Sequence, residues 1–138
     1  MLSIKYITSV FAFAALASAA PTEVQTRSEL ATPVVTVCTG SLNPRAGCVD
    51  IPVIASSCVN FLGGNSFLND EVSNAQIPAG ITCTFFANFG CLSITDFDVA
   101  LLTGGLTGNV YNLFNVPGIS GPLNFNDMTS SFICSPLF

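Results

Sequence analysis

The chain has 138 residues and a formal net charge of −5, because three Lys and Arg residues stand against eight Asp and Glu residues. Phosphate backbones and anionic lipid surfaces are poor partners for an acidic protein, so we expect neither a nucleic-acid nor a membrane partner. Histidine is absent from the sequence, which excludes Ser–His and Cys–His catalysis and metal sites with histidine ligands.

The first segment has the pattern of a secretory signal peptide. Lys5 supplies a positive charge, residues 7–16 form an apolar run too short to span a bilayer, and Ala17-Ser18-Ala19 supplies small residues for cleavage. We predict a signal peptide over 1–19, a polar tail or short pro-segment over 20–33, and a single domain over 34–138. The protein is therefore expected to be secreted and extracellular.

Six cysteines follow the predicted signal peptide, namely Cys38, Cys48, Cys58, Cys83, Cys91 and Cys134. An even number in a short secreted chain predicts three disulfides, for which the residues alone leave 15 possible pairings. No two cysteines in the sequence are separated by two intervening residues, the spacing typical of metal sites, which argues against a cysteine metal site.

Short β-branched or aromatic runs, punctuated by Gly, Pro and Asn, predict strands along the whole domain. In the first half these runs are 34–37, 49–51, 58–61 and 72–77; in the second half they are 81–86, 92–94, 109–113 and 130–134. Residues 96–106 are expected to form a loop. Four short strands per half describe an all-β fold, a β-sandwich of two Greek-key motifs over 34–80 and 81–138.

Two hexapeptides of one pattern, 69–74 and 126–131, precede or begin the last strand of each half. Each reads Asn-Asp-x-x-Ser followed by a small polar residue. Carboxylate, amide and hydroxyl oxygens are the ligands that Ca²⁺ prefers, and a local motif that occurs twice suggests a chain with two copies of one unit. The competing interpretation is that Asn-Asp and Ser only build a turn between strands.

The hexapeptides and the cysteine-bracketed hairpins together resemble the βγ-crystallin superfamily, in particular its small secreted fungal and microbial members. The family signature is [Asn/Asp]-[Asn/Asp]-x-x-[Ser/Thr]-Ser between the third and fourth strands. The second hexapeptide matches it at every defined position, whereas the first carries Asn74 where the family has Ser. Leu42 also departs from the family, since it stands where an aromatic residue is expected.

The resemblance implies a double Ca²⁺ clamp to which both hexapeptides contribute. Its ligands would be the carbonyls of Glu71 and Met128, the hydroxyls of Ser73 and Ser130, and side-chain oxygens of Asn69, Asp70, Asn126 and Asp127. It also implies that the third strand of each half pairs with the fourth strand of the other. We predict the disulfides Cys38–Cys48 and Cys83–Cys91, each closing the first hairpin of its half, and, from the crossing of the third strands, Cys58–Cys134.

We therefore interpret the chain as a secreted, non-enzymatic Ca²⁺-binding protein of the βγ-crystallin type. The alternative is an interaction protein on the same scaffold, such as a toxin, antimicrobial, inhibitor or host-directed effector, with an extracellular protein or a cell-wall component as its partner. The remaining acids offer little to an enzyme, since nothing around Asp50, Asp96, Asp98 or Asp127 suggests a raised pKa. Asp96 and Asp98 are expected to lie in a solvated loop.

Overall fold

The computed structural model describes residues 32–138, so the predicted signal peptide and residues 20–31 of the predicted tail lie outside the described residues. The elements are β1 (Val34–Cys38), β2 (Cys48–Pro52), β3 (Cys58–Asn60), β4 (Asn74–Ile77), β5 (Ile81–Phe86), β6 (Val99–Thr103), β7 (Asn109–Asn112), β8 (Val116–Pro117), β9 (Pro122–Leu123) and β10 (Ser131–Pro136), with two 3₁₀ helices, η1 (Gly63–Leu68) and η2 (Phe89–Cys91). Neither helix in this part of the chain has the length and apolar character needed to cross a bilayer.

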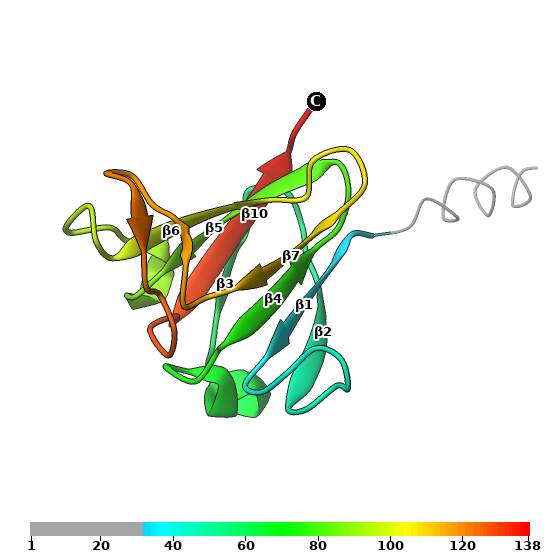
Figure 1. Ribbon diagram of the computed structural model, residues 1–138, viewed down its shortest axis with the longest axis horizontal. Coiled ribbons are helices and arrows are strands. Elements are labelled where there is room, and N and C mark those ends of the chain that lie inside the picture. Colours follow the sequence, from blue (N-terminus) through cyan, green and yellow to red (C-terminus); the bar gives the residue numbers. More distant parts are fainter. Residues whose placement is uncertain (1–31) are drawn as a thin grey trace, which may run out of the picture. The chain divides into compact units, whose positions relative to one another are not determined.

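Two four-stranded antiparallel sheets form the sandwich, with strand orders β2-β1-β4-β7 and β3-β10-β5-β6 (Figure 1). Each sheet holds the first hairpin and the fourth strand of one half, together with the third strand of the other half. Thus β7 pairs with β4, and β3 pairs with β10. The predicted fold class, an all-β sandwich of two Greek-key motifs, is confirmed.

Alternating side chains of the two sheets form the core. In β5 the inward residues Ile81, Cys83 and Phe85 alternate with half-exposed threonines, as expected for a strand with one buried face. The ring of Phe132 on β10 packs between those of Phe61 and Phe85, with ring centroids 5.9 and 5.0 Å apart. Each such fully buried phenylalanine contributes about 1.5–3 kcal/mol to stability.

The second hairpin differs from the prediction. Its return strand is β6, within the segment that was expected to be a loop, and residues 92–94, which were expected to be a strand, lie in the loop before it. The side chain of Asp98 accepts hydrogen bonds from the backbone N–H groups of Ile94 and Thr95, at 2.8 and 3.2 Å. These two N–H groups are therefore diverted from any sheet ladder.

A two-stranded ribbon, β8 with β9, was not predicted from the sequence. It is joined to the edge of the second sheet by a bridge between Ala100 on β6 and Gly118.

Of the three predicted disulfides, Cys38–Cys48 is confirmed and the other two are wrong: the structure joins Cys58 to Cys91 and Cys83 to Cys134. The reason is the register of the second sheet. Cys134 lies opposite Cys83 on the buried face, whereas Cys58 lies opposite Ile133, one residue away. Successive residues of a strand point to opposite faces, so Cys58 faces outward, where η2 supplies Cys91. The Cys58–Cys91 bridge still connects the two halves.

Candidate functional site

The two hexapeptides lie side by side and are joined by two equivalent backbone hydrogen bonds. The N–H of Asp70 donates to the carbonyl of Thr129 at 2.9 Å, and the N–H of Asp127 donates to the carbonyl of Val72 at 3.1 Å. In both cases the second residue of one hexapeptide bonds to the fourth residue of the other. The two turns are thus related by approximate two-fold symmetry.

The serine at the fifth position fixes each hexapeptide to the sandwich in the same way. The N–H of Ser73 donates to the carbonyl of Cys38 at the end of β1, and the N–H of Ser130 donates to the carbonyl of Phe86 at the end of β5. The two serine carbonyls accept from Leu113 and Phe61, which follow the third strands β7 and β3. Both turns are therefore held by a first strand and by the third strand that crosses from the other half.

The second residue of each hexapeptide has a left-handed backbone conformation, with φ of 56° at Asp70 and 58° at Asp127. Aspartate and asparagine adopt this region more readily than most residues. Both aspartate side chains are exposed. Two carboxylates are thus presented to solvent at matching positions of the paired turns.

The first residue of each hexapeptide is an asparagine whose side-chain oxygen has no hydrogen-bond partner among the described residues. Oδ1 of Asn69 and Oδ1 of Asn126 are buried and have no hydrogen-bond partner among the described residues. Leaving a buried acceptor unpaired costs about 1–3 kcal/mol, so two such atoms at equivalent positions point to an external partner for both. An oxygen-seeking cation fits these acceptors.

The paired turns differ in detail. The hydroxyl of Ser130 lies 3.3 Å from Oδ1 of Asp70, which brings ligand candidates of both hexapeptides together. No corresponding bond joins Ser73 to Asp127 among the described residues. Glu71 is exposed, whereas Met128 packs against the core and therefore offers only its backbone carbonyl.

All eight predicted ligand residues lie in the paired turns, but few of them are acidic. Within residues 32–138 no group of three or more Asp, Glu, Cys or His side chains is arranged to hold a metal ion. The donors are mainly neutral amide, hydroxyl and carbonyl oxygens, which predicts low affinity for a divalent cation.

A polar cluster that was not predicted from the sequence surrounds Asp98. Its carboxylate accepts hydrogen bonds from the side chains of Ser93 and Asn88, both at 3.0 Å, in addition to the two backbone N–H groups of Ile94 and Thr95. Partial desolvation raises the pKa of Asp98, but these four donors outweigh it and hold the pKa below its usual value. Asp96 does not join this cluster, because its carboxylate accepts from the hydroxyl of Ser120 at 2.8 Å.

Neither the models of protein families nor the curated proteins give a match to this chain. Among solved structures, the chain is similar to the crystal structure of the N-terminal domain of protein S. The identity is 15%, the TM-score is 0.47, and the alignment covers 75% of this chain and 97% of that domain.

Proposed function

We propose that this protein is a secreted, non-enzymatic Ca²⁺-binding protein of the βγ-crystallin type. The observation that carries the proposal is the pair of unpartnered asparagine oxygens, Asn69 Oδ1 and Asn126 Oδ1, in two turns related by approximate symmetry. Three disulfides among the described residues favour an oxidising, extracellular compartment.

The ion would be held by the residues that the resemblance implies. Asn69, Asp70, Asn126 and Asp127 would offer side-chain oxygens, Ser73 and Ser130 their hydroxyls, and Glu71 and Met128 their backbone carbonyls. When bound, Ca²⁺ would supply positive charge that neutralises the exposed carboxylates and would connect the two halves of the sandwich. The backbone bonds between the hexapeptides already hold both turns in place, so the ion adjusts stability and is not required for folding.

The carboxylates favour a non-enzymatic role. The hydrogen bonds from Thr36 and Arg45 lower the pKa of Asp50, and the pKa of Asp98 is also lowered. A general acid near neutral pH needs the opposite shift.

The test is calorimetric titration of the metal-free protein with CaCl₂, with MgCl₂ as the control, combined with thermal unfolding. We expect two sites with Kd on the order of 10⁻⁴–10⁻³ M, as in other extracellular modules. At a Ca²⁺ concentration ten times Kd, mass action adds about 1.4 kcal/mol and raises Tm by roughly 5–10 °C for each of the two sites. Absence of heat on titration and an unchanged Tm in 10 mM Ca²⁺ would leave the hexapeptides as turns alone.

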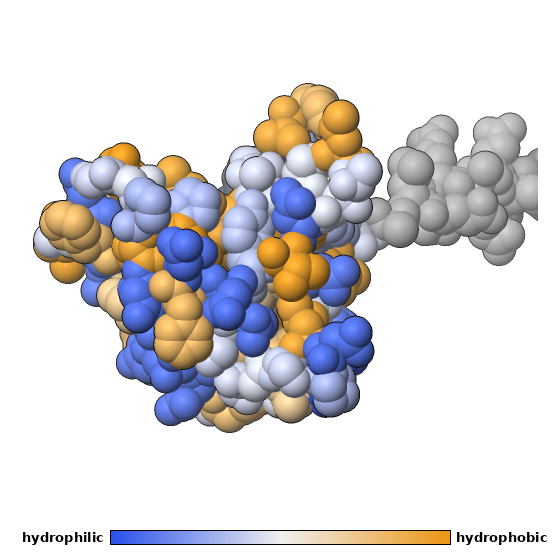
Figure 2. All heavy atoms as spheres, in the orientation of Figure 1, coloured by the Kyte–Doolittle hydropathy of each residue, from blue (hydrophilic) through white to orange (hydrophobic). Residues whose placement is uncertain are grey.

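A second candidate, an interaction protein, is favoured by the loop between η2 and β6. Ile94 and Phe97 are 80% and 68% exposed on this loop, and Figure 2 shows apolar side chains at the left edge of the molecule, where the loop lies. Asp98 holds the loop in one shape, and large apolar groups on a rigid loop are typical of binding surfaces. If Ca²⁺ does not bind, this candidate would be supported by an extracellular partner that binds the wild-type protein and does not bind Phe97→Ser.

A further inference from the structure

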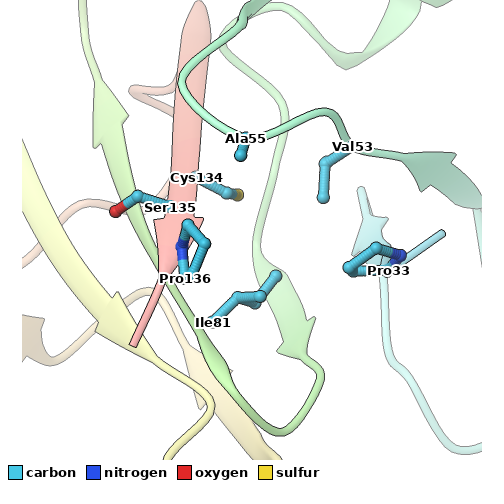
Figure 3. Close-up of a pocket in the computed structure, with 7 residues that line it drawn as sticks. All are labelled: Pro33, Val53, Ala55, Ile81, Cys134, Ser135 and Pro136. Carbon is cyan, nitrogen blue, oxygen red and sulfur yellow. The ribbon is translucent and has the colours of Figure 1, made fainter. Parts of the chain in front are cut away.

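An apolar pocket of about 240 Å³ opens at one end of the sandwich. It is lined by Pro33, Val53, Ala55, Ile81, Cys134, Ser135 and Pro136, which come from β5 and β10 of the second sheet and from the segments just before β1 and after β2 (Figure 3). Nothing in the proposed function uses these residues.

The pocket and the hexapeptides lie at opposite ends of β10. This strand begins at Ser131, the last residue of the second hexapeptide, and ends at Pro136 in the wall of the pocket. Strand β1 also runs from the pocket to the hexapeptides. It starts beside Pro33 and ends at Cys38, whose carbonyl accepts a hydrogen bond from the N–H of Ser73. A ligand in the pocket would therefore not compete with an ion at the hexapeptides.

The pocket offers a ligand almost no polar group. Carbonyls in its wall are already bonded, since Pro33 accepts from the N–H of Val53 at 2.9 Å and Cys134 accepts from the N–H of Ser56 at 2.8 Å. No lining residue carries a charge, and the hydroxyl of Ser135 points away from the cavity in Figure 3. Water in such a pocket makes few hydrogen bonds, so its displacement by an apolar molecule is favourable.

The segments that line the pocket also carry exposed apolar side chains. Exposed hydrophobic residues adjoin its lining residues in the sequence: Ile54 lies between Val53 and Ala55, and Leu137 and Phe138 follow Pro136. Ile54 is 72% and Phe138 is 85% exposed. Figure 2 shows an apolar cluster at the end of the molecule where Figure 1 places the C-terminus.

The walls are preformed. Ile81 and Pro136 are register partners in β5 and β10, and the buried disulfide Cys83–Cys134 joins these two strands beside the cavity. Binding would therefore require little ordering of the protein, which removes one of the main costs of association.

We propose that this pocket binds a small, neutral, apolar molecule with about the bulk of a bicyclic hydrocarbon. A dry cavity of about 150 Å³ holds benzene, and this pocket is larger. A fatty acid is disfavoured, because Arg45, the one cationic residue of the described chain, lies in the β1–β2 loop at the other end of β1. An acyl carboxylate would thus lack a charged partner.

The test uses the purified protein and the neutral fluorescent probe N-phenyl-1-naphthylamine. We expect enhanced, blue-shifted emission with Kd on the order of 10⁻⁵–10⁻⁴ M, equal in EGTA and in Ca²⁺. Ala55→Phe, which fills the cavity from its exposed side, should weaken binding at least tenfold. Ile94→Ser, which removes an exposed apolar side chain far from the pocket in sequence, should leave it unchanged.

A second measurement locates the probe without any variant. In methyl-detected NMR of the wild-type protein, the signals of Val53, Ala55 and Ile81 should shift on titration, and that of Ile94 should not. Three results would overturn the proposal. The probe could still bind to Ala55→Phe, it could fail to bind to Ile94→Ser, or in the wild-type protein it could shift only the methyl signals of Ile94. The proposal would also be overturned if the protein were a dimer that the probe dissociates, because a second copy of the chain would then fill the pocket. Failure of the Ca²⁺ titration does not affect these outcomes.

Discussion

Val72 and Thr129 occupy the same position of the two hexapeptides and are both completely buried, yet only Thr129 carries a hydroxyl. That hydroxyl has no hydrogen-bond partner among the described residues. Thr129→Val removes an unpaired polar group while keeping the shape of the side chain, and we expect it to stabilise the protein by about 1–2 kcal/mol. Chemical denaturation measures the change.

The reciprocal variant is the matched control for Thr129→Val. Val72→Thr should destabilise the protein by about 1–3 kcal/mol, because it places a second hydroxyl in the same kind of apolar site. Equal stabilities for Thr129→Val and the wild type would mean that the Thr129 hydroxyl has a partner after all.

The two serine hydroxyls give the most direct test of the proposed ion clamp. Ser130→Ala should weaken one Ca²⁺ site and Ser73→Ala the other, since each removes one oxygen ligand. Asp98→Ala should change neither, because Asp98 is bonded within its own loop. Calorimetric titration of the three variants separates these outcomes, and an effect of Asp98→Ala equal to that of the serine variants would contradict the assignment.

The disulfides should differ in accessibility to a reductant. Cys83 and Cys134 are almost fully buried, whereas Cys48, Cys58 and Cys91 are partly exposed. We expect Cys83–Cys134 to be reduced last by dithiothreitol under native conditions. Mass spectrometry after timed alkylation gives the order, and peptide mapping that finds Cys83 joined to Cys91 would refute the observed pairing.

Loss of the buried bridge should be the most destabilising. In a chain-entropy estimate, a bridge with a sequence separation of 51 contributes about 4 kcal/mol and one with a separation of 10 about 2.7 kcal/mol. Double alanine variants at Cys83 and Cys134, compared with those at Cys38 and Cys48, measure this difference by denaturation.

The loop before β6 should loosen in acid. The pKa of Asp98 is lowered in the folded state, so its contribution to stability is present above the unfolded pKa of about 3.9 and is lost as pH falls through the lower folded value. The protection of the Ile94 and Thr95 amides, which is their exchange rate relative to the intrinsic rate at the same pH, should fall in that range. Asp98→Asn should lower this protection already at neutral pH, and a fully protected loop in this variant would contradict the role of the carboxylate.

Gly104 lies too close to the chain to accept a side chain. A Cβ atom at this position would overlap the carbonyl of Pro78. Gly104→Ala should therefore destabilise the protein by about 1–3 kcal/mol. At Gly64 a Cβ would meet no atom within 4 Å, so Gly64→Ala is the control and should have little effect on the melting temperature.

Much of the architecture could be predicted from local sequence, and the wrong hairpin and the wrong disulfides have separate physical causes. The run of β-branched and aromatic residues at 81–86 is a strand, and the repeated hexapeptides indicated two similar halves. The return strand of the second hairpin was predicted at the wrong place, at residues 92–94. The side chain of Asp98 accepts hydrogen bonds from the backbone N–H groups of Ile94 and Thr95, which the strand pattern had assigned to a sheet. Two of the three predicted disulfides were wrong because a register difference of one residue decides which face of the sheet a cysteine occupies.

The candidate site was predictable in its residues and unpredictable in its assembly. The repeated Asn, Asp and Ser pattern and the family resemblance indicated the candidate ligands, since each hexapeptide is contiguous in the sequence. The bonds from Asp70 to Thr129 and from Asp127 to Val72 depend on the packing of two distant turns. The apolar pocket has no local signal at all, because its walls come from four separate segments.

The position of β10 also determines when folding can finish. This strand lies between β3 and β5 in its sheet, and it is the last strand of the sandwich in the sequence. During synthesis the first half emerges with β3 lacking its neighbour, and the second half is incomplete until β10 has left the ribosome. Strand β10 must therefore be translated before β3 can pair, and a stop codon ahead of β10 would leave the sandwich open.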